Sequence, residues 1–411
     1  MTVALALGST ALTTPKGWQL TTVGALADQN SGEVQTGPFG SQLHSYDYST
    51  GGTPVVMPQD LVGGKVSIRN VARVSSDHVS RLSRHQVAVD DILYSRRGDV
   101  TRFAIMTGRE EGWLCGTGCM RIRLNSSDIC PRYLSHYLRH RTVCDWLEFQ
   151  AKGATMPNLN TTILRALPLL MPPLSEQKRI AGILDQADGL RRKRQQALAL
   201  TDQFLRSTFL DLFGNPITNP KQWPLSRLSS LGHWASGGTP PRSQPQYFEG
   251  NIDWYSAGEL NHRRLPPSKE RVSDAAIGVS GARLFKEGTL LVGMYDTAAF
   301  KLGILPRAAS SNQACANLEL QESNCELDWL FNCLEMMRPY FLSQRRGVRQ
   351  KNLTLQMIKD FEIPLPPVNA QREFVTTVKA VEILQSRLVS AGSMNESFFN
   401  ALVQRAFRGE L

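Results

Sequence analysis

One stretch of the sequence occurs twice, and its two copies lie 194 positions apart, at residues 172 and 366. The first copy, Pro172–Ile180, reads Pro-Pro-Leu-Ser-Glu-Gln-Lys-Arg-Ile, and the second, Pro366–Phe374, reads Pro-Pro-Val-Asn-Ala-Gln-Arg-Glu-Phe. The same offset relates further anchor residues, without a gap, from Gly153 to Phe213 of the first copy. A long fixed period indicates that the chain consists of two copies of one structural unit.

We predict a long helix after each Pro-Pro pair, to about Phe213 in the first copy and to about Phe407 in the second. Proline is favourable just before a helix, and Ser175 and Asn369 are predicted N-caps because a short side-chain oxygen can accept an unpaired backbone N–H. Beyond them, apolar residues are spaced four and three apart, which is the period of a coiled-coil seam. In the second helix, the segment Ser390–Asn395 is predicted to kink or break the helix.

Neither helix has a partner of its own length within its copy. Each would form a rod of roughly 57 Å, since an α-helix rises about 1.5 Å per residue. We therefore expect the two rods to pack on each other and to hold the rest of each copy far apart. The sequence then divides into an N-terminal tail at 1–14, a first globule at 15–173, a central long helix at 174–214, a second globule at 215–367 and a C-terminal long helix at 368–411.

Within the globules, short apolar segments bounded by Gly and Pro predict strands. Asp90–Ser95 and Gly288–Gly293 are predicted to be equivalent core strands, and helices are predicted around Tyr133–Phe149 and Asp328–Leu342. Each globule therefore mixes strands with helices, and the predicted fold class is α+β with an internal tandem repeat.

Composition narrows the class of protein. Lys and Arg number 46 against 36 Asp and Glu, a formal net charge of +10, which favours a polyanionic partner such as nucleic acid. No apolar run approaches the roughly 18 residues of a membrane span, and the N-terminus lacks the basic segment of a signal peptide. Seven cysteines without a regular framework are typical of a reduced, cytoplasmic protein, and Cys115 and Cys119 are interpreted as small hydrophobic residues and not as zinc ligands.

The sequence contains no recognisable active site. Asn215-Pro216-Ile217-Thr218 is the nearest match to the Asn-Pro-Pro-aromatic loop of a methyltransferase, and it lacks the second proline and the aromatic residue. The phosphate-binding pattern Gly-x-x-x-x-Gly-Lys-Ser/Thr is absent, and the histidines show no metal-ligand spacing. Glu176-Gln177-Lys178 opens a helix, whereas nuclease carboxylates and lysine need to cluster around a metal. We therefore predict a non-catalytic chain that binds no metal.

Side chains suited to DNA are plentiful in both globules. Arg96-Arg97-Gly98 follows a predicted strand, where guanidinium groups can bind phosphates or guanine edges. The predicted DNA contacts of the first globule are Gln59, Lys65, Arg69, Arg73, Arg81, Arg84, Arg96, Arg97 and Arg102. Those of the second globule are Arg242, Gln244, Tyr255, Arg263, Arg264, Tyr295, Lys301, Asn312 and Gln313. The run Arg191–Arg194 lies mid-helix and is interpreted first as a solvated helix face.

Two globules, each followed by Pro-Pro-x-x-x-Gln-Lys/Arg and a long helix, resemble the specificity subunit of type I restriction–modification enzymes. The motifs that carry the resemblance are Pro168–Ile180, Pro364–Arg372, the Gly-Gly-Thr-Pro at 237–240 and the closing Arg405–Leu411. The resemblance implies two target-recognition domains, each reading one half of a split DNA site, and two long antiparallel helices that space them and dock modification subunits. The helix residues predicted to bind partners are Gln177, Ile180, Leu184, Phe204, Gln371, Phe374, Val378 and Phe398.

The resemblance also implies the chemistry of the partners. Two modification subunits would carry S-adenosylmethionine and methylate adenine, and restriction subunits would use ATP and Mg²⁺ to cleave distant DNA. None of these cofactors is expected on this chain. Two alternatives stay open: a coiled-coil scaffold that binds only proteins, which predicts no salt-dependent DNA binding, and a fragment of a fused methyltransferase–nuclease, which would need the missing catalytic motifs.

Overall fold

The computed structural model describes residues 4–5, 12–151, 156–279, 281–321, 324–345 and 352–411. The chain forms two compact units, one of residues 1–194 with 391–411 and the other of residues 195–390. Within the predicted tail 1–14, Ala4–Leu5 (β1) pairs with Leu12–Thr13 (β2), and residues 1–3 and 6–11 lie outside the described residues. No helix in the described part of the chain combines the length and apolar character that crossing a bilayer requires.

The first unit is built on a four-stranded antiparallel sheet and a three-stranded mixed sheet. The first sheet has the order β10 (Phe103–Ile105), β9 (Ile92–Ser95), β12 (Cys119–Arg123), β4 (Glu33–Thr36). The second has the order β11 (Leu114–Cys115), β5 (Thr53–Val56), β8 (Ala72–Val74), with β11 parallel to β5. Smaller pairs are β3 (Gln19–Thr22) with β13 (Pro168–Met171) and β6 (Leu61–Val62) with β7 (Lys65–Val66). Helices are α1 (Val23–Gln29), α2 (Ser76–Arg81), α3 (Pro131–Leu138), α4 (Arg141–Gln150) and α5 (Thr161–Ala166).

The second unit repeats this topology. Its four-stranded sheet has the order β15 (Gly232–Ser236), β21 (Cys315–Leu320), β18 (Leu290–Gly293), β19 (Leu302–Ile304). Its three-stranded sheet has the order β17 (Glu270–Val272), β16 (Ile252–Tyr255), β20 (Ser310–Ser311), again with one parallel pair. The other elements are the pair β14 (Leu225–Arg227) with β22 (Glu362–Pro364) and helices α7 (Asp274–Val279), α8 (Leu327–Ser343) and α9 (Leu355–Asp360).

The predicted repeat of two α+β globules is therefore confirmed, because β9 and β18 occupy the same place in equivalent sheets. One predicted helix is wrong in extent. The segment Tyr133–Phe149 forms two helices, since the chain leaves the helical conformation at His140, which caps α4 by accepting a hydrogen bond from the Thr142 N–H. The equivalent segment of the second unit is the single helix α8.

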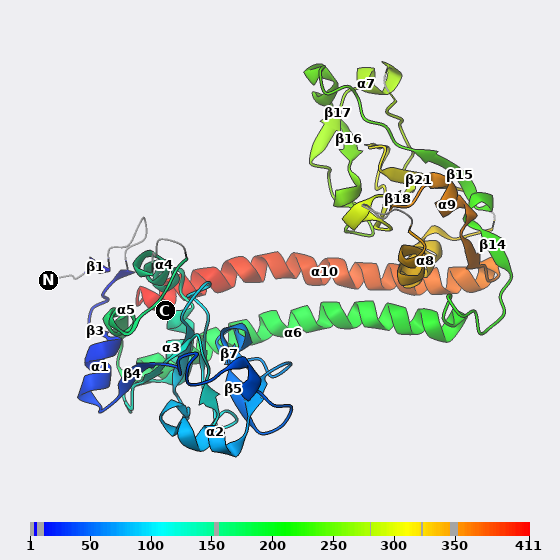
Figure 1. Cartoon of the computed structure of the whole chain (residues 1–411). Helices are drawn as coiled ribbons and strands as arrows, with labels where there is room; N and C mark the ends of the chain where they lie inside the picture. Colours follow the sequence, from blue (N-terminus) through cyan, green and yellow to red (C-terminus); the bar gives the residue numbers. More distant parts are fainter. Residues whose placement is uncertain (1–3, 6–11, 152–155, 280, 322–323, 346–351) are drawn as a thin grey trace. The chain divides into compact units, whose positions relative to one another are not determined.

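The two long helices are α6 (Leu174–Phe213) and α10 (Val368–Phe407), drawn in Figure 1. They begin at the predicted residues 174 and 368, but Ser175 and Asn369 lie inside the first turn and are not the predicted N-caps. The carbonyl of the second proline accepts the first helical N–H groups instead, at Pro173 from Glu176 and Gln177. The expected break at 390–395 is absent, because α10 is helical through this segment.

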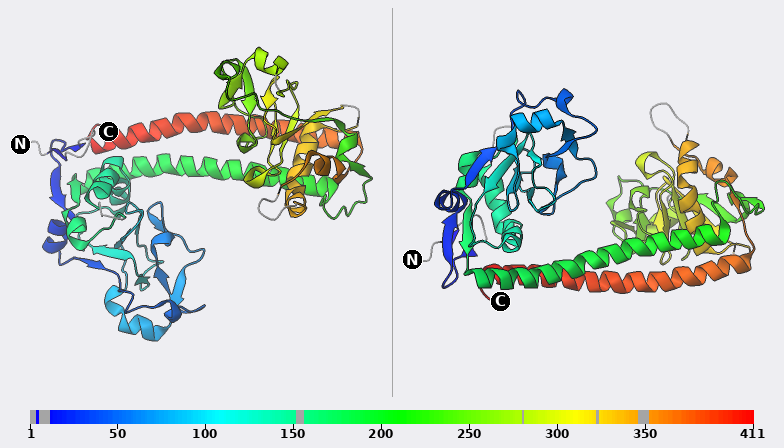
Figure 2. Two further views of the ribbon diagram at one scale, coloured as in Figure 1. Left: turned by 45° about the horizontal axis from the view of Figure 1, so that its top comes forward. Right: turned by 90° about the horizontal axis from the view of Figure 1, so that it is seen from below.

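Within each unit, the helices pack antiparallel, as the resemblance implied. In the first unit, Arg179 near the start of α6 donates to the carbonyl of Leu411, just beyond the end of α10, at 2.8 Å. In the second unit, Phe209 near the end of α6 contacts Phe374 near the start of α10, with ring centres 5.4 Å apart. Figure 2 shows the helix segments of each unit running side by side.

The hydrophobic core of each unit joins a globule to both helices. In the first core, Phe407 from the end of α10 is fully buried against Tyr133, Tyr137 and His140, with ring centres 5.2–5.7 Å apart. Its repeat counterpart Phe213, from the end of α6, is buried in the second core. Each globule is therefore closed by the start of one long helix and by the end of the other.

Replacement of Phe407 by alanine should destabilise the first unit by about 3–5 kcal/mol, because it removes a fully buried aromatic side chain and leaves a cavity. Amide hydrogen exchange in α3 and α4 measures this loss. Phe398→Ala is the matched control, since that ring is 58% exposed on the same helix and its loss should leave exchange unchanged. Equal exchange in the two variants would contradict the role of Phe407 in this core.

Candidate nucleic-acid interface

The glutamine of the repeated motif fixes each long helix to its globule. Gln177 is buried; its Oε1 accepts the Cys130 N–H at 2.9 Å, and its Nε2 donates to the carbonyls of Asp128 and Pro172. Gln371 makes the same set of bonds with the Glu326 N–H and two carbonyls of the second unit. A primary amide suits this place because it supplies one acceptor and two donors. We call these two groups of bonds the glutamine clamps.

Most of the helix residues predicted to bind partners are therefore misassigned. Their side chains are covered by their own chain and have no surface left for another protein; they are Gln177, Ile180, Leu184, Gln371, Phe374 and Val378. Phe204 and Phe398 are different, since they occupy matching positions on the two helices and are 54% and 58% exposed. The coiled-coil spacing selected buried and exposed residues alike, because it records which helix positions are apolar and not which of them the globule covers.

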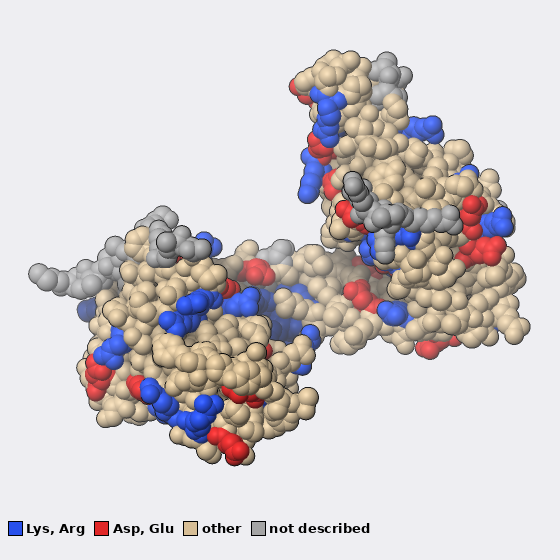
Figure 3. Space-filling view, viewed as in Figure 1, with Lys and Arg blue, Asp and Glu red and all other residues tan. Residues whose placement is uncertain are grey.

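Most of the predicted DNA contacts of the first globule lie at its surface, where Figure 3 shows Lys and Arg side chains gathered in patches. Arg73 donates to the carbonyl of Gly52 and Arg81 to that of Gln42, which fixes the direction of each side chain. Arg102 pairs with Asp99 at 3.0 Å. Arg96 is half-buried at the turn after β9, where its carbonyl accepts the N–H of Leu159.

A buried polar cluster holds the backbone around Arg84. The carbonyl of Arg84 accepts hydrogen bonds from Arg121 Nη1 at 3.0 Å and from Gln35 Nε2 at 2.8 Å. Arg121 is 2% exposed and also pairs with Glu33 at 2.8 Å. Burial lowers the pKa of the adjacent His85, and Arg84 and Arg121 act in the same direction, so this imidazole is neutral at neutral pH.

Sequence reasoning missed Arg121. Its only signal is the alternation of β12, in which Met120 and Ile122 face the hydrophobic core while Arg121 faces the other way. The strand pattern could not show that this second face is also covered, by the loop that carries Arg84.

In the second globule, two predicted contacts form ion pairs within their own unit. Arg263 has a side chain only 18% exposed, stacks over Phe331 at 4.7 Å and pairs with Asp328 of α8 and Glu382 of α10. Arg264 pairs with the same two carboxylates. Burial lowers the pKa of Arg263 and raises that of Glu382. Both arginines therefore join the globule to α10. The enclosed Arg263 is corrected as a DNA contact, whereas Arg264, with a side chain 42% exposed, stays a predicted one.

Tyr255 is corrected as well, because its ring is 1% exposed and its hydroxyl donates to the Pro266 carbonyl at 2.9 Å. The other candidates lie at or near the surface of the second globule: Arg242, Gln244, Tyr295, Lys301, Asn312 and Gln313. The Gln313 side chain accepts a hydrogen bond from the Thr239 hydroxyl, which brings the loop that carries Arg242 next to the loop at 312–313. Arg242 stacks over Phe248 at 4.1 Å and pairs with Glu270.

In the mid-helix basic run, Arg191 and Arg192 form ion pairs. Asp188 of α6 is 4% exposed and pairs with Arg191 at 3.0 Å, with Arg192 at 3.4 Å and with Arg139 of the globule at 4.0 Å. Asp188 lies 194 positions before Glu382, which is half-buried, so at this repeat position each long helix places a carboxylate where its globule supplies arginine. In the first globule, burial raises the pKa of the Cys115 thiol to about 12, so the thiol stays protonated and packs as a small core residue.

Comparison with known proteins shows similarity along nearly the whole chain. The family described as type I restriction modification DNA specificity domain matches residues 15–200 and again residues 220–392. The putative type I restriction enzyme MjaX specificity subunit of Methanocaldococcus jannaschii is 23% identical over 356 residues, which cover 81% of this chain and 81% of that protein.

Solved structures show a similar fold. The S subunit of a type I restriction–modification system from M. genitalium matches with a TM-score of 0.57 and 13% identity, over 95% of this chain and 96% of that chain. A chain from a type I restriction–modification system, solved to explain complex assembly and conformational transition, matches with a TM-score of 0.56 and 19% identity, over 97% and 99% of the two chains. At such identities the likeness concerns the fold alone.

The glutamine clamp can be tested in the first unit. Gln177→Leu keeps the size of the side chain but leaves the Cys130 N–H and two carbonyls without a partner, which should cost about 1–3 kcal/mol per group. Chemical unfolding of the full chain, followed by hydrogen exchange at residues 128–138, measures the loss. Gln196→Leu on the exposed face of the same helix is the control; a clamp variant as stable as this control would show that the clamp contributes nothing.

Proposed function

This chain belongs to the family of type I restriction–modification DNA specificity domains, and we propose that it selects the DNA sites of a type I complex, each globule reading one half of a bipartite site. The observation that carries this proposal is the pair of globules with one sheet topology and different surfaces. A shared scaffold with different surface loops is what reading two different half-sites from one chain requires.

The two globules would combine general and sequence-specific binding. Exposed arginines such as Arg69, Arg84 and Arg97 supply phosphate contacts, which fix the register of the protein on the duplex and depend on salt. Side chains that reach the groove, with Gln59 and Gln313 among the candidates, supply hydrogen bonds to base edges. Each correct base pair would then contribute about 1–3 kcal/mol of discrimination.

We propose that methylation and cleavage are carried out by partner subunits. Two modification subunits would bring S-adenosylmethionine, and restriction subunits would bring ATP and Mg²⁺. No residue of this chain is assigned a catalytic role, since the sequence has neither the methyltransferase loop nor the phosphate-binding loop described above.

The exposed stripe of the long helices is the proposed docking surface for the modification subunits. Phe398 and Leu190 are exposed in the first unit, and their repeat counterparts Phe204 and Leu384 are exposed in the second. Exposed apolar side chains of this size at matched positions are typical of protein–protein contacts. One such site in each unit is consistent with two modification subunits for each chain.

Single-molecule methylome sequencing tests the specificity role. A host that expresses this chain with its modification subunit should show N6-methyladenine at a split motif, and the motif should vanish when this chain is removed. Methylation that does not depend on this chain would contradict the proposal. A chain that acts only as a protein scaffold would also show no loss of DNA affinity between 50 and 200 mM salt, whereas six phosphate contacts predict a loss of about 10³-fold.

Docking is tested separately. The double variant Phe204→Ser, Phe398→Ser should keep its thermal stability, because both rings are exposed, and should lose assembly with the modification subunit in size-exclusion chromatography. Phe149→Ser, at a 54% exposed position on α4, is the control. Complete assembly of the double variant would place the docking surface elsewhere.

A further inference from the structure

The first globule presents two exposed aromatic side chains on one loop. The loop follows β4 and runs from Gly37 to Tyr48. Phe39 is 56% exposed, and Tyr46, in the short 3₁₀ helix Ser45–Asp47, is 78% exposed. Large aromatic rings at the surface are unfavourable in water and mark a binding surface when polar groups surround them.

Hydrogen bonds hold this loop in one conformation. The Phe39 N–H donates to the side-chain oxygen of Gln42 at 3.0 Å, and the Phe39 carbonyl accepts the N–H groups of Gln42 and Leu43. Leu43 is 3% exposed and anchors the loop in the core. Farther along, the His44 N–H donates to Asp47 at 2.8 Å. A ring held in this way binds with little loss of conformational entropy.

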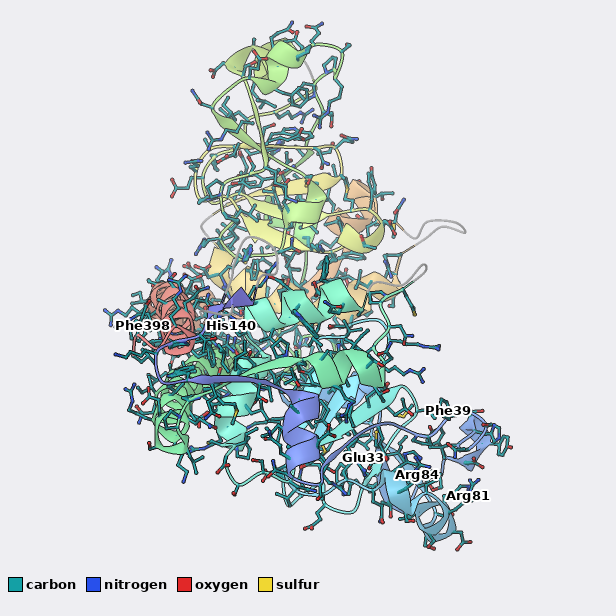
Figure 4. All side chains as sticks on the ribbon, turned by 90° about the vertical axis from the view of Figure 1, so that its left-hand side faces the viewer. Glu33, Phe39, Arg81, Arg84, His140 and Phe398 are labelled. Carbon is teal, nitrogen blue, oxygen red and sulfur yellow. The ribbon has the colours of Figure 1, made fainter. Side chains whose placement is uncertain are left out.

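Three arginines lie near the loop that carries Phe39. Arg81 of α2 donates from Nη2 to the carbonyl of Gln42 at 3.0 Å, so the helix is tied directly to the aromatic loop. The Arg96 guanidinium carbon lies 6.0 Å from the centre of the Phe39 ring. Arg84 is exposed just beyond α2, with its backbone held by Arg121 and Gln35. In Figure 4, Phe39, Arg81 and Arg84 lie at one edge of the globule, away from His140 and Phe398.

From this arrangement we propose that Phe39 contacts the bases of double-stranded DNA, stacking on or wedging into one base step of the first half-site while Arg81 and Arg84 bind phosphates beside it. The inference rests on the proposed function and names the residue through which one globule acts. An apolar ring flanked by cations matches a base step flanked by phosphates, because the ring replaces base stacking where the arginines neutralise the backbone. A protein partner fits this surface less well, because it would have to place acidic residues opposite the guanidinium groups near the ring.

The equivalent loop of the second globule contains no aromatic residue. This loop, at 236–243, carries Arg242, which stacks on Phe248 and Trp254 of its own chain. We therefore expect the wedge to act at one half-site only, which makes the two halves of the DNA site unequal in their response to mutation.

The test uses the complex of the full chain with its modification subunits and a duplex that carries the split motif from the methylome. Phe39→Ala should weaken specific binding by about 5- to 100-fold, the range for loss of one stacked aromatic ring. Phe39→Trp should bind within about threefold of the wild type, and Phe149→Ala should bind as the wild type. Arg84→Gln should lower the slope of log K against log salt by about one, whereas Phe39→Ala should leave that slope unchanged.

A second readout reports the wedge directly. 2-Aminopurine placed in turn along the first half-site should fluoresce more strongly at one step when the wild-type complex binds, and this increase should disappear with Phe39→Ala. Equal affinity and equal fluorescence for Phe39→Ala and Phe149→Ala would overturn the inference. It would also be overturned if Phe39→Ala lost the modification subunit and kept its DNA affinity. Failure of the proposed function is distinct, since the wild type itself would then bind no split motif.

Discussion

The attachment of each long helix to its globule is the constraint on which the rest of the structure depends. Gln177 and Gln371 saturate their amide groups with backbone atoms of the loop just before α3 or α8 and with the carbonyl of the first proline of the motif. Both amides are buried, so any rotation of the helix start would leave polar groups without partners at a cost of about 1–3 kcal/mol each. These buried bonds therefore fix the orientation of each long helix relative to the globule to which it is attached.

The same helices close the cores at their other ends. Phe407 completes the first core and Phe213 the second, so the last turn of the chain belongs to the unit that contains its beginning. The first unit is therefore discontinuous in sequence, whereas the second is the continuous segment 195–390. The recurring carboxylates, buried Asp188 and half-buried Glu382, add charge pairs between helix and globule at the same repeat position.

Arginine is used for two purposes in this chain. Arg121 and Arg263 are held by carboxylates and carbonyls and support the fold, whereas Arg69, Arg84 and Arg97 reach the surface. The exposed group carries the proposed contacts to phosphate, and the enclosed Arg121 holds the backbone of Arg84, one of those contacts. Net charge alone counts both groups alike, because it records composition and not the depth of a side chain.

Periodicity and internal repetition in the sequence determined the two α+β globules and the two long helices, because helix and strand patterns depend on nearest neighbours and on a period that persists over many residues. The N-terminal cap of α6 was decided by backbone bonds to the Pro173 carbonyl, which the capping preference of Ser175 does not predict. The unbroken course of α10 was decided by the helix as a whole and not by the low helix propensity of Gly392. The roles of Arg263, Tyr255 and Gln177 were decided only by the tertiary structure, because their partners lie up to about 120 positions away in the chain. A sequence shows which groups a side chain carries, whereas burial and pairing depend on which distant segments fold against it.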